Sequence, residues 1–209
     1  MTKKINKQKR IVLTGGPGVG KSSIIHFLKE IGFSVREEVF TKIFEMANNE
    51  GNLNEEFLHS QELIQELISA QIHLEDQDEM KEFVFLDRSC IDIWGFARNM
   101  GIVLKTKDKM TLEGRHYDLV FLVDPMPQEF YVQNGIRRQT FEESLVHHQA
   151  NLENAVDFLK LQERDLSTTL IRVPFFHNNR PLSVKERSQV ILDQLQRFGV
   201  DNPKKNWKE

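Results

Sequence analysis

The sequence predicts an α/β fold in which a parallel sheet is covered by helices on both faces. Three observations support this. A glycine-rich segment separates an apolar strand from an amphipathic helix within residues 10–28, two later apolar runs are continuous, and helical stripes alternate with the strands. Continuous apolar runs are typical of strands that are buried on both faces. Strands that alternate with helices form parallel sheets.

The expected strands are short, and a helical pattern separates most of them. We expect strands at 10–14, 33–35, 83–86, 119–123 and 169–174. The apolar spacing predicts helices at 24–31, 39–49, 54–78, 91–100, 141–159 and 184–199. Capping boxes begin the last two, at Thr140 and Ser183, and Leu145 is expected on the inward face of the first of these two helices. Residues 105–115 are polar and match no single pattern.

The composition is that of an ordinary soluble protein. The chain has 209 residues, of which 39% are hydrophobic and 28% charged, and its formal net charge is −3. We therefore expect one domain at 9–200, a flexible basic tail at 1–8, a polar tail at 201–209 and no specific binding of nucleic acid. The single cysteine, Cys90, excludes an internal disulfide and fits the core of a cytoplasmic protein. We see no signal peptide or membrane span, and expect a monomer or homodimer.

Residues 15–22 match the phosphate-binding pattern G-x-x-x-x-G-K-[ST]. Glycines allow successive backbone N–H groups to surround an anion, and the following helix directs its positive end at the same point. Lys21 is then expected to reach the β- and γ-phosphates, and Ser22 to ligate Mg²⁺. The residues predicted to bind the nucleotide are Gly15, Gly16, Pro17, Gly18, Val19, Gly20, Lys21, Ser22 and Ser23.

Asp87 and Arg88 directly follow an apolar strand, and chemistry in parallel sheets concentrates at such carboxyl ends. Asp87 is the candidate second Mg²⁺ ligand, opposite Ser22, and Arg88 is a candidate phosphate clamp. The alternative is a structural ion pair, with Ser89 or Asp87 capping the next helix. Asp124 also follows an apolar strand, but Pro125 and the turn favour a structural role.

Two further positions are candidates for catalysis. Glu38, preferred over the adjacent Glu37, follows the second strand and is a candidate base for an acceptor hydroxyl, with a structural role as the alternative. Arg137 and Arg138 lie in a polar segment that could close over ATP, although a solvated pair is the alternative. Weaker candidates for base contacts are Phe175, Phe176, His177, Asn178 and Arg180, and for an acceptor pocket Phe44, Phe57, Gln61 and Trp94. The histidine spacing does not match a zinc motif.

The chain resembles the small "AAA domain" P-loop proteins that are similar to ribosylnicotinamide kinase, and more distantly the thymidylate and deoxynucleoside kinases. The resemblance rests on residues 15–22, 85–89 and 131–138. It implies a three-layer P-loop NTPase fold with five strands in the order 2-3-1-4-5, an Asp-Arg pair that serves Mg²⁺ and phosphates, and an arginine-bearing lid. The chain departs from the deoxynucleoside kinases at 36–38, where Arg-Glu-Glu stands without their Glu-Pro.

Two functions fit these features. The first is Mg²⁺–ATP-dependent phosphoryl transfer to a small hydroxyl-bearing acceptor such as a nucleoside, nucleotide or related metabolite, with GTP as an alternative donor. The second is a nucleotide-binding switch or slow NTPase that acts on a protein or lipid partner. A Ras-type GTPase is disfavoured because its guanine motif is absent, and a hexameric AAA+ machine because little chain remains for a lid domain.

Overall fold

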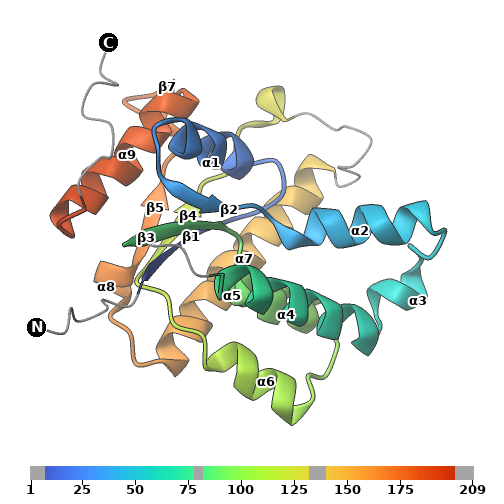
Figure 1. Cartoon of the computed structure of the whole chain (residues 1–209). Helices are drawn as coiled ribbons and strands as arrows, with labels where there is room; N and C mark the ends of the chain where they lie inside the picture. Colours follow the sequence, from blue (N-terminus) through green and yellow to red (C-terminus); the bar gives the residue numbers. More distant parts are fainter. Residues whose placement is uncertain (1–7, 78–81, 132–139, 201–209) are drawn as a thin grey trace, which may run out of the picture.

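Five parallel strands form the central sheet of the computed structural model, which describes residues 8–77, 82–131 and 140–200 (Figure 1). The strands are β1 (Lys9–Thr14), β2 (Ser34–Arg36), β3 (Phe83–Asp87), β4 (Leu119–Val123) and β5 (Leu170–Val173). Their order is β2-β3-β1-β4-β5. The predicted α/β class and the strand order that the resemblance implied are both confirmed. The expected tails lie almost wholly outside the described residues.

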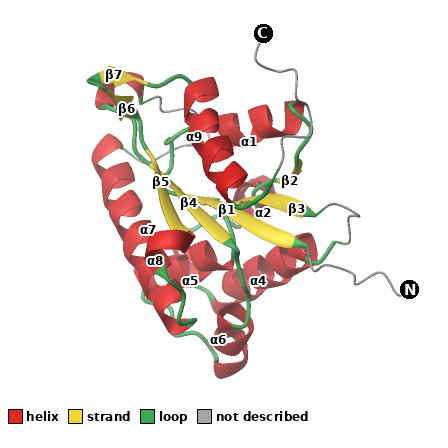
Figure 2. Ribbon diagram, turned by 90° about the vertical axis from the view of Figure 1, so that its left-hand side faces the viewer, coloured by secondary structure: helices red, strands yellow, loops and turns green. Residues whose placement is uncertain are grey.

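Helices cover both faces of the sheet (Figure 2). They are α1 (Lys21–Glu30), α2 (Val39–Asn49), α3 (Glu55–Leu58), α4 (Gln61–Glu75), α5 (Cys90–Asn99), α6 (Thr106–Glu113), α7 (Phe141–Leu161), α8 (Leu166–Thr169) and α9 (Val184–Arg197). A 3-10 turn, η1 (Gln128–Phe130), follows β4, and a small hairpin of β6 (Phe176–His177) and β7 (Arg180–Pro181) follows β5.

The core is divided between the two faces because the central strands β1, β3 and β4 are buried from both sides. On one face, α1 and α9 pack their apolar stripes against Leu13, Phe85 and Phe121. On the other, α4, α5 and α7 pack against Val12, Leu86 and Val120 together with α2. Alternate residues of these central strands therefore serve opposite cores, which explains the continuous apolar runs. Cys90 is buried in the second core, as expected.

The register aligns the strand ends that carry the candidate residues. Leu13 of β1 lies opposite Asp87 of β3, and Arg36 of β2 lies opposite Leu86. The residues that follow β1, β2 and β3 consequently emerge at one edge of the sheet. This edge holds the phosphate loop, Glu38 and the Asp87–Arg88 pair.

Three helical predictions need correction. The expected helix at 54–78 is two helices, because the Ser60 side chain accepts a hydrogen bond from the Leu63 N–H and begins α4. The unassigned segment at 105–115 contains α6. In α7, Leu145 is 38% exposed, whereas Ser144 and His148 are buried. This end of α7 faces the polar phosphate loop rather than an apolar core, which explains its polar inner side.

Candidate active site

The phosphate loop joins β1 to α1 in a conformation that needs its glycines. Gly15 and Gly20 have φ of +137° and +89°, values that L side chains rarely adopt. A Cβ on Gly15 would also lie 2.7 Å from the Val123 carbonyl oxygen. Gly20 is the N-cap of α1 and has no side chain to cap the helix, so the first N–H groups of α1 are available to an anion.

Lys21 lies inside this loop. Its Nζ donates hydrogen bonds to the carbonyl oxygens of Gly15 and Gly16, at 3.0 and 2.8 Å. Burial, and after it the positive charge of Arg88, lower the pKa of Lys21 to about 8, although nearby carboxylates oppose the shift. The ammonium group is still mostly protonated at pH 7, and an anionic phosphate would stabilise it.

The outside of the loop is held by two helices that are distant in the sequence. From α7, the Ser144 hydroxyl donates to the Pro17 carbonyl oxygen at 2.6 Å, and the His148 Nδ1 accepts the Gly16 N–H at 3.4 Å. From α9, the Arg187 guanidinium donates to the Val19 carbonyl oxygen at 2.7 Å. No local sequence pattern distinguishes any of the three, because each lies among other polar residues of its helix.

Asp87 and Ser22 come together as the sequence predicts. The Ser22 hydroxyl donates to Asp87 Oδ2 at 3.1 Å, and the buried Oδ1 has no hydrogen-bond partner within the described part of the chain. Burial raises the pKa of Asp87, and the attraction of Lys21 only partly offsets this. A buried carboxylate oxygen without a partner beside a hydroxyl fits Mg²⁺, which takes few protein oxygens and retains waters and phosphate oxygens.

Arg88 is held in a network of carboxylates. It is a non-glycine residue at φ +68°, and this unusual backbone directs its side chain across the edge of the sheet. Its Nε donates to Glu38 Oε1 at 2.6 Å, and its Nη1 donates to Asp92 Oδ1 at 3.1 Å. Although burial alone lowers the pKa of Arg88, the Glu38 and Asp92 carboxylates raise it above its ordinary value. Arg88 is therefore a permanent cation at the site.

Glu38, rather than Glu37, belongs to this cluster. Glu37 is exposed and pairs with Lys29 at 3.0 Å. Burial raises the pKa of Glu38, but the charges of Arg88 and Lys21 outweigh it and leave the pKa below the ordinary value. Glu38 is thus ionised at neutral pH and able to accept a hydrogen bond from an incoming hydroxyl.

Asp92 also belongs to the cluster around Arg88 and Glu38, and it was not among the residues predicted from the sequence. Its Oδ1 also accepts a hydrogen bond from Thr14 at 2.7 Å, and its Oδ2 accepts from the Ser89 N–H at 2.9 Å. Ser89 is the N-cap of α5, and Ser89 and Asp92 form a capping box. The S-x-x-D pattern at 89–92 was a readable signal. Of the two alternatives named for this region, the structure shows the structural one, with Ser89 as the helix cap and an Arg88–Asp92 ion pair beside it, and the roles of Asp87 and Arg88 toward Mg²⁺ and phosphate stay predictions.

Asp124 is in a different setting from Asp87. Its Oδ1 pairs with Arg172 Nη2 at 2.9 Å, an ion pair that joins the ends of β4 and β5. This supports the structural role that the sequence favours for Asp124. Arg137 and Arg138, the candidate lid residues, lie outside the described residues.

Among the candidates for base and acceptor contacts, Phe175 and the aromatic acceptor candidates pack against other side chains, whereas the remaining base candidates are exposed, namely Phe176, His177, Asn178 and Arg180. Phe175 is buried between the Phe130 ring and the Arg187 guanidinium, and residues 176–181 form the β6–β7 hairpin. On the other side, Phe44 packs against Phe96. Of the other acceptor-pocket candidates, Trp94 packs against Phe158 and Phe57 packs against the core. The side-chain amide of Gln61 donates a hydrogen bond to the Val103 carbonyl oxygen.

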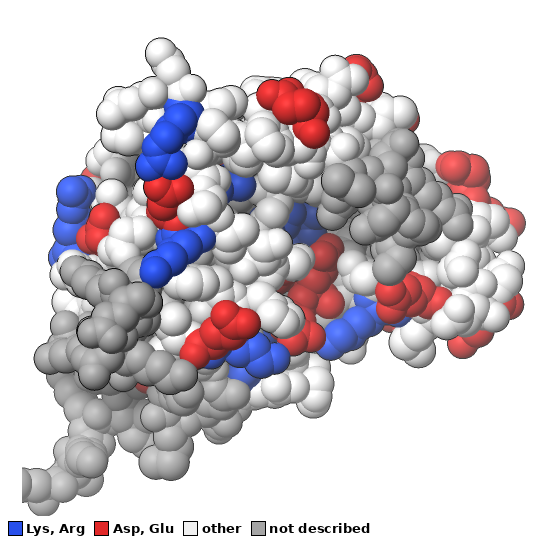
Figure 3. All heavy atoms as spheres, turned by 90° about the horizontal axis from the view of Figure 1, so that it is seen from above, with Lys and Arg blue, Asp and Glu red and all other residues white. Residues whose placement is uncertain are grey.

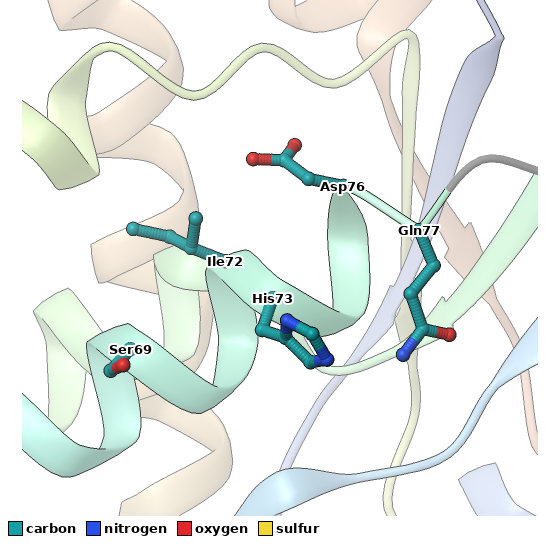
Figure 4. A pocket seen from close by; sticks show the side chains of 5 residues that line it. All are labelled: Ser69, Ile72, His73, Asp76 and Gln77. Atoms are coloured by element: carbon teal, nitrogen blue, oxygen red, sulfur yellow. The ribbon is translucent and has the colours of Figure 1, made fainter.

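A separate cavity of about 460 Å³ lies at the far end of α4 (Figure 4). Its lining residues are Ser69, Ile72, His73, Asp76 and Gln77. None of them belongs to the charge cluster, and Asp76 is already paired with Arg10 and Arg115. The candidate site is therefore located by the phosphate loop and the charged side chains that meet at the carboxyl ends of the strands, and not by this cavity.

On the face shown in Figure 3, the described residues form no large surface patch of a single charge sign. Among the described residues there, Lys and Arg side chains are interspersed with Asp and Glu. Within the described ranges, no helix has both the length and the apolarity that crossing a bilayer requires.

The sheet order, together with the glycine loop between β1 and α1, defines a P-loop NTPase fold. A family model described as "AAA domain" matches residues 10–170, and the chain belongs to this family. No curated protein matches the chain.

Solved structures of similar fold include NadR in complex with NR, with a TM-score of 0.65 and 18% identity over 96% of this chain. The chain spans about half of that protein, 54% of its length. Thymidylate kinase from Ehrlichia chaffeensis has a TM-score of 0.60 and 11% identity, over 90% of this chain and 99% of its own. Deoxyadenosine kinase from M. mycoides, with products dcmp and dcdp bound, has a TM-score of 0.56 and 17% identity over the same shares, 90% and 99%. At these identities the likeness establishes the fold, and it confirms the predicted resemblance.

Proposed function

We propose that this protein binds ATP with Mg²⁺ and transfers the terminal phosphoryl group to a small hydroxyl-bearing acceptor, such as a nucleoside, nucleotide or related metabolite. One observation carries the proposal. Two cations, Lys21 and Arg88, and the Asp87 and Glu38 carboxylates converge beside the phosphate loop at one edge of the sheet. The family membership and the kinases among the proteins of similar fold support the same function.

In the proposed reaction, the acceptor oxygen attacks the γ-phosphorus while the bond from that phosphorus to the β–γ bridging oxygen breaks. ADP leaves with the electron pair of that bond, and the hydroxyl proton passes to Glu38 or to solvent. Phosphoryl transfer through a loose transition state needs mainly positioning and charge neutralisation. Lys21 and the α1 N-terminus are suited to hold the phosphates, and Arg88 to face the phosphoryl group in transit.

Ser22 and Asp87 are the residues that would hold Mg²⁺, since they offer a hydroxyl and a buried carboxylate oxygen without a partner. When bound, the ion would neutralise charge on the phosphate oxygens. Glu38 orients Arg88 through the 2.6 Å contact, so the general-base candidate and the phosphate clamp are one ion pair. An acceptor that binds between Glu38 and Arg88 would have to weaken this ion pair in order to contact either side chain.

The decisive experiment measures ADP release from Mg²⁺–ATP in the presence of a panel of nucleosides, nucleoside monophosphates and vitamin ribosides. We expect at least one acceptor to stimulate release, and we expect Lys21→Ala to abolish the stimulation. A matched control is Lys29→Ala, which removes an exposed lysine of the same helix. Tight ATP binding without stimulation by any acceptor would overturn phosphoryl transfer and favour the alternative, a nucleotide switch or slow NTPase.

A further inference from the structure

Arg187 is a buried cation that lies directly behind the phosphate loop. It stands in the first turns of α9, and only 3% of the residue is exposed. Its Nη1 donates to the Val19 carbonyl oxygen at 2.7 Å, and its Nη2 donates to the carbonyl oxygens of Asp124 and Val173, at 2.8 and 3.5 Å. The Phe175 ring covers the guanidinium at 5.3 Å.

The partners of Arg187 are carbonyl dipoles, and its charge has no direct counter-ion in the described part of the chain. The Asp124 carboxylate, whose charge raises the pKa of Arg187, pairs with Arg172 instead. The Nε of Arg187 is also buried without a hydrogen-bond partner. Fully buried arginines are usually paired with a carboxylate, since an unpaired buried charge is costly. The positive end of the α9 dipole adds to this cost.

Burial lowers the pKa of Arg187 to about 10. The guanidinium is nevertheless protonated at neutral pH. The Arg187 guanidinium is consequently a positive charge that no side chain of the described residues neutralises directly.

The Val19 contact connects this charge to the inside of the loop. The Val19 carbonyl belongs to the same peptide unit as the Gly20 N–H, at the N-terminus of α1. Arg187 Nη1 lies 3.4 Å from the position that a Gly20 Cβ would occupy. A cation at a carbonyl oxygen polarises the peptide group and strengthens its N–H as a donor. A phosphate that accepts from this N–H gains from both the polarised peptide and the nearby charge.

We propose that Arg187 is a positioning residue of the nucleotide site, which acts through the Val19–Gly20 peptide and makes affinity depend on the negative charge of the bound polyphosphate. The inference rests on the proposed function. It adds that α9, far from the loop in sequence, discriminates ligands by their number of phosphates. The bound anion in turn supplies the compensation that Arg187 lacks in the empty protein.

The test compares dissociation constants for ATP, ADP and inorganic tripolyphosphate, by calorimetry, in the wild type and three variants. Arg187→Gln retains a donor and loses the charge, whereas Arg187→Lys retains the charge. Arg172→Gln is the control, because it removes the exposed arginine that pairs with Asp124. We expect Arg187→Gln to bind ATP and tripolyphosphate about tenfold more weakly and ADP about threefold more weakly, as for a nearby charge in a partly screened site. The control should stay within about twofold for all three ligands, as for an exposed arginine.

A structural role for Arg187 would instead give equal losses for ATP and ADP, or none, and either result overturns the inference. If Arg187→Gln does not fold, Arg187→Lys decides. The wild-type ratio of ATP to ADP affinity should persist in that variant, and a collapse of the ratio to one refutes a charge effect. A wild type that binds neither ATP nor tripolyphosphate would overturn the proposed function itself. If the wild type binds ATP and tripolyphosphate but Arg187→Gln leaves the dissociation constants unchanged, only the inference about Arg187 is refuted.

Discussion

Replacing Asp87 with Asn tests the proposed metal site with little change in shape. The substitution removes the negative charge of the carboxylate. Within the described residues, its Oδ1 has no hydrogen-bond partner and is placed to bind Mg²⁺, while its Oδ2 accepts a hydrogen bond from the Ser22 hydroxyl. A unit charge pair at about 4 Å is worth about 4 kcal/mol at an effective dielectric constant of about 20. Partial replacement by the amide oxygen and by water reduces this loss. We expect the Mg²⁺ concentration for half-maximal ATP turnover to rise by about 10²-fold.

The same substitution is not expected to lower the folding stability of the protein in the absence of Mg²⁺. Burial raises the pKa of Asp87 above the ordinary 3.8, so this group favours folding below that value and loses its contribution as the pH rises through the folded pKa. At pH 7 the ionised carboxylate therefore opposes folding. Without Mg²⁺, Asp87→Asn should unfold at a temperature no lower than the wild type. A higher Mg²⁺ requirement combined with undiminished stability separates a functional carboxylate from a structural one.

Turnover is measured by coupled ADP detection across a Mg²⁺ titration, and stability by thermal denaturation with a chelator. Asp124→Asn is the matched control, since Asp124 also follows a central strand but is paired with Arg172. It should lower stability modestly and leave the Mg²⁺ titration unchanged. An unaltered Mg²⁺ titration in Asp87→Asn would refute the metal assignment.

Three further outcomes follow from the contacts around the loop and the helices. Gly16→Ala places a Cβ 2.7 Å from the Ser144 carbonyl oxygen and 3.0 Å from His148 Cβ, so ATP affinity should fall at least tenfold in calorimetry; wild-type affinity would contradict the close approach of α7. Burial lowers the pKa of His148 below the ordinary 6.5, and only its neutral ring accepts the Gly16 N–H. Both stability and ATP affinity should therefore hold above about pH 6.5 and decline as the pH falls through the range below it. His148→Asn, which accepts at any pH, should remove this step from the binding profile, and an identical profile in the two proteins would exclude His148. Gly95→Ala brings a Cβ to 2.3 Å from the buried Asn154 amide nitrogen, and chemical denaturation should show a loss of about 1–3 kcal/mol, whereas unchanged stability would show that α5 and α7 can separate freely.

The features that local pattern determines were readable from the sequence. The strand–loop–helix unit at 10–28, the apolar runs of β3 and β4, and the capping boxes at Thr140 and Ser183 are all present in the structure. Each depends on residues within one or two turns of chain, or on burial from both faces, which leaves a continuous apolar run. Asp87 could be placed because the carboxyl ends of parallel strands meet at one edge of the sheet.

Tertiary structure alone decided which distant side chains complete the site. His148 and Arg187 contact the loop across 132 and 168 residues of sequence, and each lies among other polar residues of its helix. Helical periodicity separates apolar from polar faces, so a polar residue reads as exposed even where it faces a buried polar loop. The pairing of Arg88 with Glu38 rather than with solvent follows from the register of β2 on β3, which no local pattern specifies. The sequence by itself thus determined the fold and the phosphate loop, whereas the packing of α7 and α9 decided what holds that loop, because those contacts form only once the sheet brings the helices together.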